Sequence, residues 1–384
     1  MDFSEDPVHR ELRAAVGAIC ERFGGAYYAR KAEAREPTTE LWRALAEHGF
    51  VGVNLPEAYG GGGAGLAELT IVCEASAAHG CPLLLLLVSS AISGELISTY
   101  GTDAQRKEWL PGMASGEAKL AFAITEPDAG SNTHRLATTA TRDGGHWVLR
   151  GQKHYITGVD EADAILVVAR TGTDEATGHA RLSLFIVDTD APGLEKQLLP
   201  VSIALPERQY TLFFDDVRVP ADRLVGTEGD GFTQVFHGLN PERITSAAAC
   251  VGIGRYALAK AAEHATQRVV WDQPIGAHQG VSHALAKAKI EVELAALMTA
   301  RAAWLHDHGQ PAGEAANMAK YAAAEAALAA VDAAIQSHGG NGLAVEYGLV
   351  PLWGFARLLR IAPVNREMIL NFVAQHSLGL PRSY

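Results

Sequence analysis

The feature that most constrains the fold of this chain is a double change in hydrophobic period. Over residues 1–120 apolar residues recur at three-and-four spacing, as in PVHRELRAAVGAICERF and TELWRALAEHGFVGV, which predicts amphipathic helices. Over residues 121–229 the pattern becomes short alternating or wholly apolar runs, such as HWVLRGQKHYIT and LSLFIVD. Turn clusters such as RDGGH and DAPG separate these runs, which predicts β hairpins. Over residues 230–384 the helical period returns.

We therefore expect a multidomain α+β protein with domains at residues 1–120, 121–229 and 230–384. Successive βαβ units are absent from the pattern, which argues against a doubly wound nucleotide-binding fold. The two strongest helical patterns near the C-terminus are rich in alanine and poor in exposed charge, as in NMAKYAAAEAALAAVDAAIQSHGG. Such helices should pack on several sides, in a bundle and at a subunit interface.

Charge and cysteine usage narrow the possible partners and the compartment. The formal net charge of −12, with Lys and Arg scattered along the chain, argues against a nucleic-acid or anionic-membrane surface. A local basic pocket for a phosphorylated ligand stays open. The four cysteines lie far apart without metal-ligand spacing, so we expect buried reduced thiols, no metal site and a cytoplasmic protein. The acidic start MDFSEDPVHREL does not resemble a secretory signal, and PLLLLLV is too short to cross a bilayer.

The stretch GIGRYA matches a loose glycine-rich dinucleotide pattern. A dinucleotide-binding loop follows a strand and opens a helix. Gly252 and Gly254 lie instead inside a helical pattern that begins near Ile244 and continues through LAKAAEHA. We interpret these two glycines as sites of close helix packing.

Two strand ends in the β region carry hydroxyl groups and an aromatic ring. In FAITEPDAGSN a β run ends at Thr125, and an acidic turn with small residues, including Gly130 and Ser131, follows. Such a turn can present backbone N–H groups and hydroxyls to an acceptor-rich ring or a phosphate, although an ordinary strand-to-turn transition also explains it. In GQKHYITG, Tyr155 and Thr157 are two residues apart, so a regular strand would direct both to one side. The ring could cover a flat cofactor whose edge the hydroxyl reaches.

The stretch HGLNPERI raises the question of a catalytic base. Pro241 at a first helical position, Asn240 as its cap and Glu242 in the first turn make an ordinary helix start. In the alternative interpretation Glu242 is a general base. Helical spacing places small or apolar residues beneath it that could leave room for a ligand, namely Ser246, Ala249 and Ile253.

Four motifs together resemble the acyl-CoA dehydrogenase family. They are AFAITEPDAGSN, GQKHYITG, RVVWDQPIGAHQ and IQSHGGNG, which occur in the order and at the spacing of that family along essentially the whole chain. The resemblance implies an N-terminal helical domain, a middle β-barrel and a C-terminal four-helix bundle. It further implies FAD as cofactor, an acyl thioester as substrate, an electron-transfer flavoprotein as acceptor and a homotetramer built as a dimer of dimers.

The resemblance implies three groups of FAD-binding residues. The isoalloxazine group comprises Phe122, Ile124, Thr125, Gly130, Ser131, Tyr155 and Thr157. The group that reaches FAD across a subunit interface comprises Arg268, Trp271 and Gln279. The adenine and pyrophosphate group comprises Gln336, Gly339 and Gly340. An arginine supplies countercharge and glycines let the backbone approach phosphate, although a glycine helix cap also explains SHGGNG.

The family carries its base at one of two places. Many members have a glutamate near the C-terminus. In this chain the matching stretch is RIAPVNREM, and the position of that glutamate is taken by Pro363. Glu367 lies four residues further on, and the resemblance implies that it points towards the cofactor. Another branch, which includes isovaleryl-CoA dehydrogenases, carries the base on a helix, and GLNPERI aligns with that segment. The resemblance thus assigns Glu242 as the base that removes the α proton while the β hydride goes to flavin N5. Ser131, Asn240 and Arg243 would contact the substrate, with surface or capping roles as alternatives for the last two.

Pro363 departs from the family pattern. The family's thioester carbonyl accepts a hydrogen bond from the backbone N–H at that position, and proline has none. Losing such a donor typically costs about 3 kcal/mol. Either Val364 supplies its N–H instead, or the substrate is activated differently, or the reaction is not dehydrogenation. Asn365, where the family has threonine, is a second departure.

The function expected is FAD-dependent α,β-dehydrogenation of an acyl thioester, most simply an acyl-CoA. The alternatives are a flavin monooxygenase or oxidase, a dehydrogenase of thioesters on an acyl carrier protein, and a non-catalytic flavin-binding protein.

Overall fold

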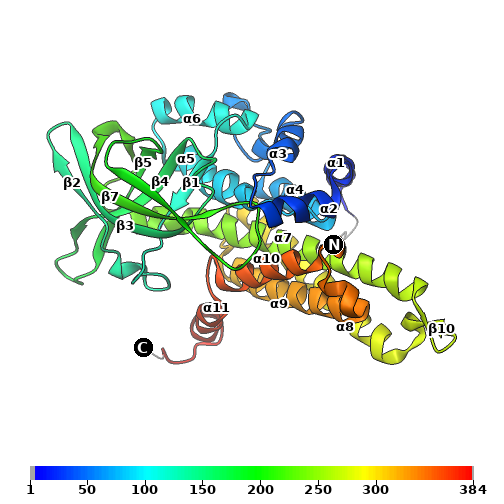
Figure 1. Ribbon diagram of the computed structural model, residues 1–384. Coiled ribbons are helices and arrows are strands. Elements are labelled where there is room, and N and C mark those ends of the chain that lie inside the picture. The colour runs from blue at the N-terminus through cyan, green and yellow to red at the C-terminus, as the bar shows by residue number, and fades with distance from the viewer. Residues whose placement is uncertain (1–4, 383–384) are drawn as a thin grey trace.

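The structure is a computed structural model that describes residues 5–382, so the start of the acidic N-terminal segment lies outside the described residues. The N-terminal part is helical, as its period predicts (Figure 1). Its α helices are α1 (Pro7–Glu21), α2 (Gly24–Ala34), α3 (Thr39–Ala46), α4 (Leu66–Ala78), α5 (Glu95–Tyr100) and α6 (Asp103–Ser115). The apolar run at 82–88 is buried and becomes helical at Leu84, and Leu86–Gly94 forms a π-helix, η3. Short 3₁₀ turns are η1 (Phe50–Gly52) and η2 (Glu57–Tyr59).

The middle part is a mainly antiparallel sheet. Its strands are β1 (Leu120–Ala123), β2 (Thr139–Asp143), β3 (His146–Thr157), β4 (Ala164–Thr173), β5 (Ala180–Asp188), β6 (Leu194–Leu199), β7 (Gln209–Pro220) and β8 (Leu224–Val225). They pair in the order β6-β7-β3-β2-β4-β5-β8, and β1 pairs in parallel with β4. Within the described residues the end strands β6 and β8 do not pair with each other, so hydrogen bonds leave the expected barrel open. Two 3₁₀ turns interrupt the strands, η4 (Thr133–Arg135) and η5 (Ala221–Arg223).

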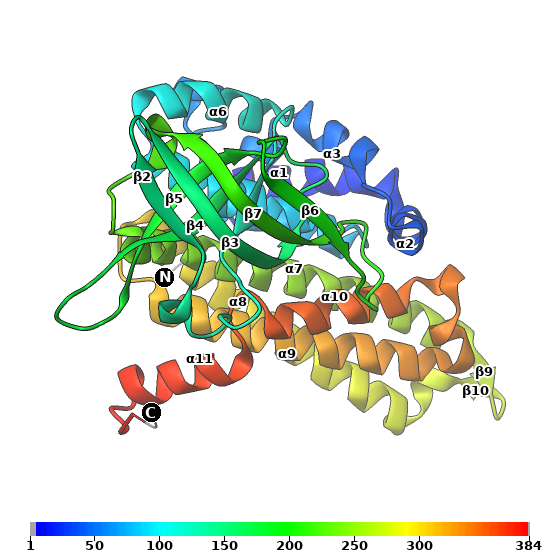
Figure 2. The ribbon, with the colours of Figure 1, turned by 60° about the vertical axis from the view of Figure 1, so that its left-hand side comes forward.

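The C-terminal part is a helical bundle. Its helices are α7 (Gly231–Gln267), α8 (Gln279–Asp307), α9 (Gly313–His338), α10 (Leu349–Ile361) and α11 (Arg366–Phe372), which continues as a π turn, η9 (Val373–Ser377). The expected four-helix bundle is formed by α7 to α10, with α9 against α7, α8 and α10. A small hairpin of β9 (Val269–Val270) and β10 (Gln273–Pro274) joins α7 to α8, and 3₁₀ turns are η6 (Ile275–Ala277), η7 (Gly339–Leu343) and η8 (Val345–Tyr347). Helix α11 projects from the bundle (Figure 2).

Helix α7 does not begin at Pro241, so the predicted helix start there was wrong. The helix begins at Gly231 and runs through Pro241, although an interior proline removes one helical N–H and its ring crowds the carbonyl one turn earlier. Val235 and Leu239, on the turns before the proline, pack against a core shared by α5, α6 and the sheet. Tertiary packing therefore carries the helix across a residue that local propensity treats as a boundary.

The N-terminal helices and the C-terminal bundle are joined by an unusual helix cap. The residue before α4 is Gly65, which has no side chain to cap the helix. Asp307, the last residue of α8, instead accepts hydrogen bonds from the backbone N–H groups of Leu66 at 2.8 Å and Ala67 at 2.9 Å. A residue from the end of one domain thereby completes a helix of another.

The two glycines of GIGRYA lie inside α7 at helix contacts, as predicted. A Cβ added at Gly252 would come within 2.3 Å of the Glu74 carbonyl oxygen of α4. A Cβ at Gly254 would come within 2.7 Å of Val292 on α8. Both positions thus allow α7 to approach its neighbours closely.

We expect Gly252→Ala to lower the free energy of unfolding by about 1–3 kcal/mol, because the added methyl meets backbone that cannot turn aside. The shift of the urea midpoint measures this. Gly313→Ala is the matched control, since a Cβ at Gly313 in α9 meets nothing within 4 Å. The control should be neutral or stabilising, and an equal loss in both variants would contradict the packing argument.

The structure bears on two expectations from the sequence, namely buried cysteines and an apolar run too short to cross a bilayer. The four cysteines are free and buried, as expected, and burial raises the pKa of Cys20 and of Cys250 to about 12. Among the described residues, no helix has the length and apolar character needed to span a membrane.

Candidate active site

Glu242 and its neighbours lie in the first half of α7, one residue after Pro241. Glu242 is half-buried, and Arg243 is 5% exposed, so the surface role considered for Arg243 is wrong. The Arg243 guanidinium donates to the Asn240 side-chain oxygen at 2.8 Å and lies over the ring of Phe236. The Arg243 Nε and the Ser246 hydroxyl are buried without a hydrogen-bond partner in the described part of the chain. This face of α7 therefore offers a carboxylate and unsatisfied donors.

The surroundings of Glu242 disfavour its charge. Burial raises the pKa of Glu242 to about 8, and the nearby cations Arg243 and Lys320 lower it only in part. A carboxyl group poised near neutrality can both take up and release a proton at working pH. The residues beneath it are buried: Ala249 and Ile253 belong to the main hydrophobic core rather than to an open ligand space.

Lys320 of α9 is a buried charged residue near Glu242 that the sequence analysis did not single out. It is 2% exposed, and its ammonium group donates to the backbone carbonyl of Val364. Burial lowers the pKa of Lys320 to about 8, while Cys250 and Glu242 oppose that shift. The only sequence signal is that Lys320 is the single lysine of an alanine-rich helix.

The segment after Pro363 connects this region to the β domain. The Asn365 side-chain nitrogen donates to the Ser131 hydroxyl at 2.8 Å, and the Asn365 side-chain oxygen caps α11 by accepting from Met368 at 2.9 Å. The backbone N–H of Val364 has no acceptor among residues 5–382. The structure thus brings Ser131 to the turn that follows Pro363, and leaves one free donor there.

A buried ion pair shapes the loop that carries the predicted flavin residues. The Lys153 ammonium is fully buried, 2.8 Å from Glu126, and donates to the Ile124 carbonyl at 2.9 Å. Glu126 also accepts from the backbone of Ala137 at 2.6 Å and Thr138 at 3.0 Å. Burial lowers the pKa of Lys153 to about 8, against the pull of Glu126. Strand β1 itself ends at Ala123, two residues before Thr125.

The residues predicted to line the isoalloxazine ring lie in that loop and on β3. Phe122, Ile124 and Thr125 are half-buried, and Gly130 and Ser131 are exposed. The Thr125 hydroxyl has no hydrogen-bond partner in the part of the chain that the structure describes, which leaves it free for a ligand.

The assumption of a regular strand at Tyr155 was wrong. A β-bulge falls between Lys153 and Ile156, and Tyr155 has a left-handed φ of 58°. Tyr155 is nevertheless 58% exposed, while Thr157 donates to the Gln209 side chain at 3.1 Å. The ring is available to a ligand, whereas the Thr157 hydroxyl already has a partner within the sheet.

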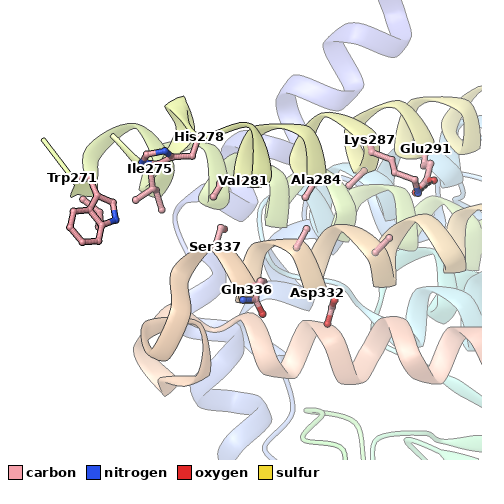
Figure 3. A pocket seen from close by; sticks show the side chains of 15 residues that line it. Trp271, Ile275, His278, Val281, Ala284, Lys287, Glu291, Asp332, Gln336 and Ser337 are labelled. Atoms are coloured by element: carbon pink, nitrogen blue, oxygen red, sulfur yellow. Dashed lines mark hydrogen bonds and ion pairs between the residues drawn. The ribbon is translucent and has the colours of Figure 1, made fainter. Parts of the chain in front are cut away.

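The other predicted FAD residues lie at the far end of the molecule from the β domain (Figures 1 and 2). A cavity of about 720 Å³ lies between α8, α9 and the β9–β10 hairpin, and Trp271 and Gln336 line it (Figure 3). Trp271 is 85% exposed, and Arg268, Gln279, Gly339 and Gly340 are also exposed. A Cβ at Gly339 or Gly340 would meet nothing within 4 Å, so there is room for a ligand above both. Within one chain, these residues therefore lie far from the predicted isoalloxazine residues of the β domain.

One cluster of potential metal ligands occurs in the described part of the chain. Glu95, His237 and His306 place ligand atoms within 4.8 Å of one another. His237 already bonds Glu95 at 3.2 Å, and His306 lies 3.5 Å from Asp307. The three residues form a polar cluster where α5, α7 and α8 meet, and the absence of a metal site stays a prediction.

Comparisons with known proteins cover the whole fold. Residues 6–117, 121–217 and 229–378 match the acyl-CoA dehydrogenase N-terminal, middle and C-terminal domains respectively. The acyl-CoA dehydrogenase FadE12 of Mycobacterium tuberculosis (strain ATCC 25618 / H37Rv) is 56% identical over 384 residues, 100% of this chain and 99% of its own. Among solved structures, glutaryl-coenzyme A dehydrogenase with glutaryl-CoA has a TM-score of 0.94 at 30% identity, covering 100% of this chain and 98% of its own.

A further solved structure, PigA in its FAD complex, has a TM-score of 0.90 at 26% identity, covering 99% of this chain and 100% of its own. Fold and comparisons together define an oxidoreductase that acts on a CH–CH group with a flavin. More narrowly, the chain belongs to the acyl-CoA dehydrogenase family, which uses FAD.

Proposed function

We propose that this protein is an FAD-dependent α,β-dehydrogenase of acyl-CoA thioesters in which Glu242 is the base. The observation that carries the proposal is a half-buried carboxyl group on α7 with a pKa near 8. The resemblance of GLNPERI to the segment that carries the base in one branch of the family supports it. The usual C-terminal position holds Pro363, which has no carboxylate. Glu367, the next acidic residue, is exposed on α11.

The chain's own groups have separate roles in the proposed reaction. Glu242 takes the α proton, and the electron pair left at the α carbon forms the new double bond as the β hydride departs. FAD, when bound, accepts that hydride at N5. Arg243 and Asn240 hold the thioester near Glu242, and the free N–H of Val364 replaces the donor lost at Pro363 by bonding the thioester carbonyl. Ser131 meets the pantetheine or phosphate part of the substrate.

The structure also supports an assembly in which a second copy completes the cofactor site. The predicted isoalloxazine residues lie in the β domain, whereas the other two groups lie around the β9–β10 hairpin and the end of α9, at the far tip of the bundle (Figures 1 and 2). All three groups therefore contact one FAD only if the last two come from a neighbouring subunit. Helix α8 exposes a row of large apolar residues, Ile290, Leu294 and Leu297, each at least 60% exposed. Such a row on a long helix suits a subunit interface, and we propose the family's homotetramer. An electron-transfer flavoprotein is the acceptor proposed.

Anaerobic titration of the purified protein with acyl-CoAs of different length and branching tests the proposal. The oxidised-flavin absorbance should bleach with at least one of them, and the reduced protein should react slowly with oxygen. Rapid oxygen consumption would favour an oxidase or monooxygenase. Bleaching only by thioesters on an acyl carrier protein would change the substrate class, and absence of bleaching by any thioester would reject dehydrogenation.

The pH dependence of flavin reduction follows from the raised pKa of Glu242. The base acts as carboxylate, and its deprotonated fraction falls about tenfold for each pH unit below a pKa of about 8. We therefore expect the second-order rate of flavin reduction by acyl-CoA to rise from pH 6 to about 8 and then level off. Stopped-flow measurement at low substrate concentration checks this, and a flat profile from pH 6 to 9 would contradict it.

A further inference from the structure

We propose that Lys320 is a positioning residue that fixes the turn after Pro363 beside Glu242 and holds a positive charge next to that base. The inference rests on the proposed function, which it deepens. Lys320 is well placed for both roles because α9, its helix, packs along α7, which carries Glu242. A lysine that is 2% exposed is not a solvated surface charge, so its ammonium group must be satisfied inside the protein.

The first role is mechanical. The Lys320 ammonium donates to the Val364 carbonyl, 44 residues further along the chain. The next residue, Asn365, bonds Ser131 of the β domain and caps α11 through Met368. A continuous set of hydrogen bonds thus runs from α9 through the turn to the loop predicted to meet FAD and substrate. These hydrogen bonds fix the position of Val364, whose backbone N–H has no acceptor in the described chain.

The second role is electrostatic. The titratable and charged groups around Lys320 are Glu242, Arg243 and Cys250 on α7 and Glu325 on α9. Among them Glu242 gains most from a second cation, because burial disfavours its carboxylate and only Arg243 otherwise opposes that penalty. Loss of the Lys320 charge should therefore raise the pKa of Glu242 and move base catalysis to higher pH.

Two substitutions separate the roles. Lys320→Gln keeps an N–H donor for the Val364 carbonyl but removes the charge, and Lys320→Met removes both. In flavin-reduction profiles both variants should show the rising limb shifted upwards by about one pH unit, equivalent to a tenfold loss of rate at pH 7. Only Lys320→Met should also raise KM, about tenfold. Lys289→Gln, which removes an exposed lysine paired with Glu293 on α8, should change neither quantity.

A measurement without substrate keeps the positioning role testable if no thioester reduces the flavin. Amide hydrogen exchange at the start of α11 reports on the turn, because the Met368 and Ile369 N–H groups both bond Asn365. Lys320→Met should speed exchange there about tenfold while α1 keeps its wild-type protection, and Lys320→Gln should stay near wild type. Wild-type exchange at α11 in Lys320→Met would overturn the mechanical role, and unmoved pH limbs in both variants would overturn the electrostatic one. Failure of wild-type protein to bleach concerns the proposed function alone.

Discussion

Glu242→Gln should lower the rate of flavin reduction by an acyl-CoA by about 10²–10⁴-fold while FAD stays bound. A positioned base contributes about that factor, and glutamine keeps the shape of the side chain without accepting the proton. Rapid mixing of the anaerobic variant with substrate, followed by the absorbance of the oxidised-flavin band, measures the rate. The FAD content of the purified variant, read from the same band, should match that of the wild type.

Glu367→Gln is the matched control for this experiment. Glu367 is the acidic residue nearest to Pro363 in sequence, and it is exposed on α11. It should retain wild-type rates. If Glu367→Gln abolished bleaching and Glu242→Gln did not, the base would lie on the C-terminal segment and the assignment to α7 would be wrong.

Glu242→Gln should also make the protein more stable at alkaline pH. The folded-state pKa of Glu242, about 8, lies above the unfolded value of about 4.5, so the folded state binds more protons between these values. Stability contributed by this group is therefore present below pH 4.5 and is lost as pH rises through 8. Glutamine removes the penalty, which the full pKa difference puts at about 4 kcal/mol at pH 8. The melting temperatures of the two proteins should differ little at pH 5 and much more at pH 8.

Lys153→Met should destabilise the protein by about 3–5 kcal/mol, because it leaves the buried Glu126 carboxylate without its cation. It should also weaken FAD binding, since Lys153 holds the Ile124 carbonyl within the loop that carries Thr125 and Ser131. Urea unfolding and FAD titration of the apoprotein measure the two effects.

Two further variants test that this ion pair is the cause. The double variant Lys153→Met/Glu126→Gln removes both charges and should recover part of the lost stability. Lys289→Met breaks an exposed pair, with side chains 59% and 42% exposed, and should cost under about 0.5 kcal/mol. Equal losses in Lys153→Met and Lys289→Met would show that burial of the pair does not matter.

The order of helical, β and helical parts could be predicted because hydrophobic period reports directly on which faces are buried. Strand β3 matches the predicted run HWVLRGQKHYIT from end to end. Strand β6 was missed because LEKQLL is exposed or half-buried throughout and has no alternation. The start of α7 was misplaced for the opposite reason: local chemistry at Pro241 signals a boundary, and long-range packing of Val235 overrides it.

Only those residues of the candidate site that a local motif surrounds could be singled out from the sequence. Glu242 could be singled out because a motif surrounds it in sequence. Lys320 could not, since a lysine among alanines is usually a solvated charge, and its partners Glu242 and Val364 lie far from it along the chain. The bulge at Tyr155 was equally invisible, because it depends on how β3 pairs with β7.

The cap that Asp307 provides for α4 has a consequence for biosynthesis. Helix α4 is complete in sequence at residue 78, but its first N–H groups bond a carboxylate from residue 307. During translation the N-terminal helices therefore emerge long before their cap exists, and a cap is worth about 1 kcal/mol. A nascent or truncated chain ending before residue 307 should hold α4 loosely, which makes that helix a place where chaperones and proteases first meet an unfinished molecule.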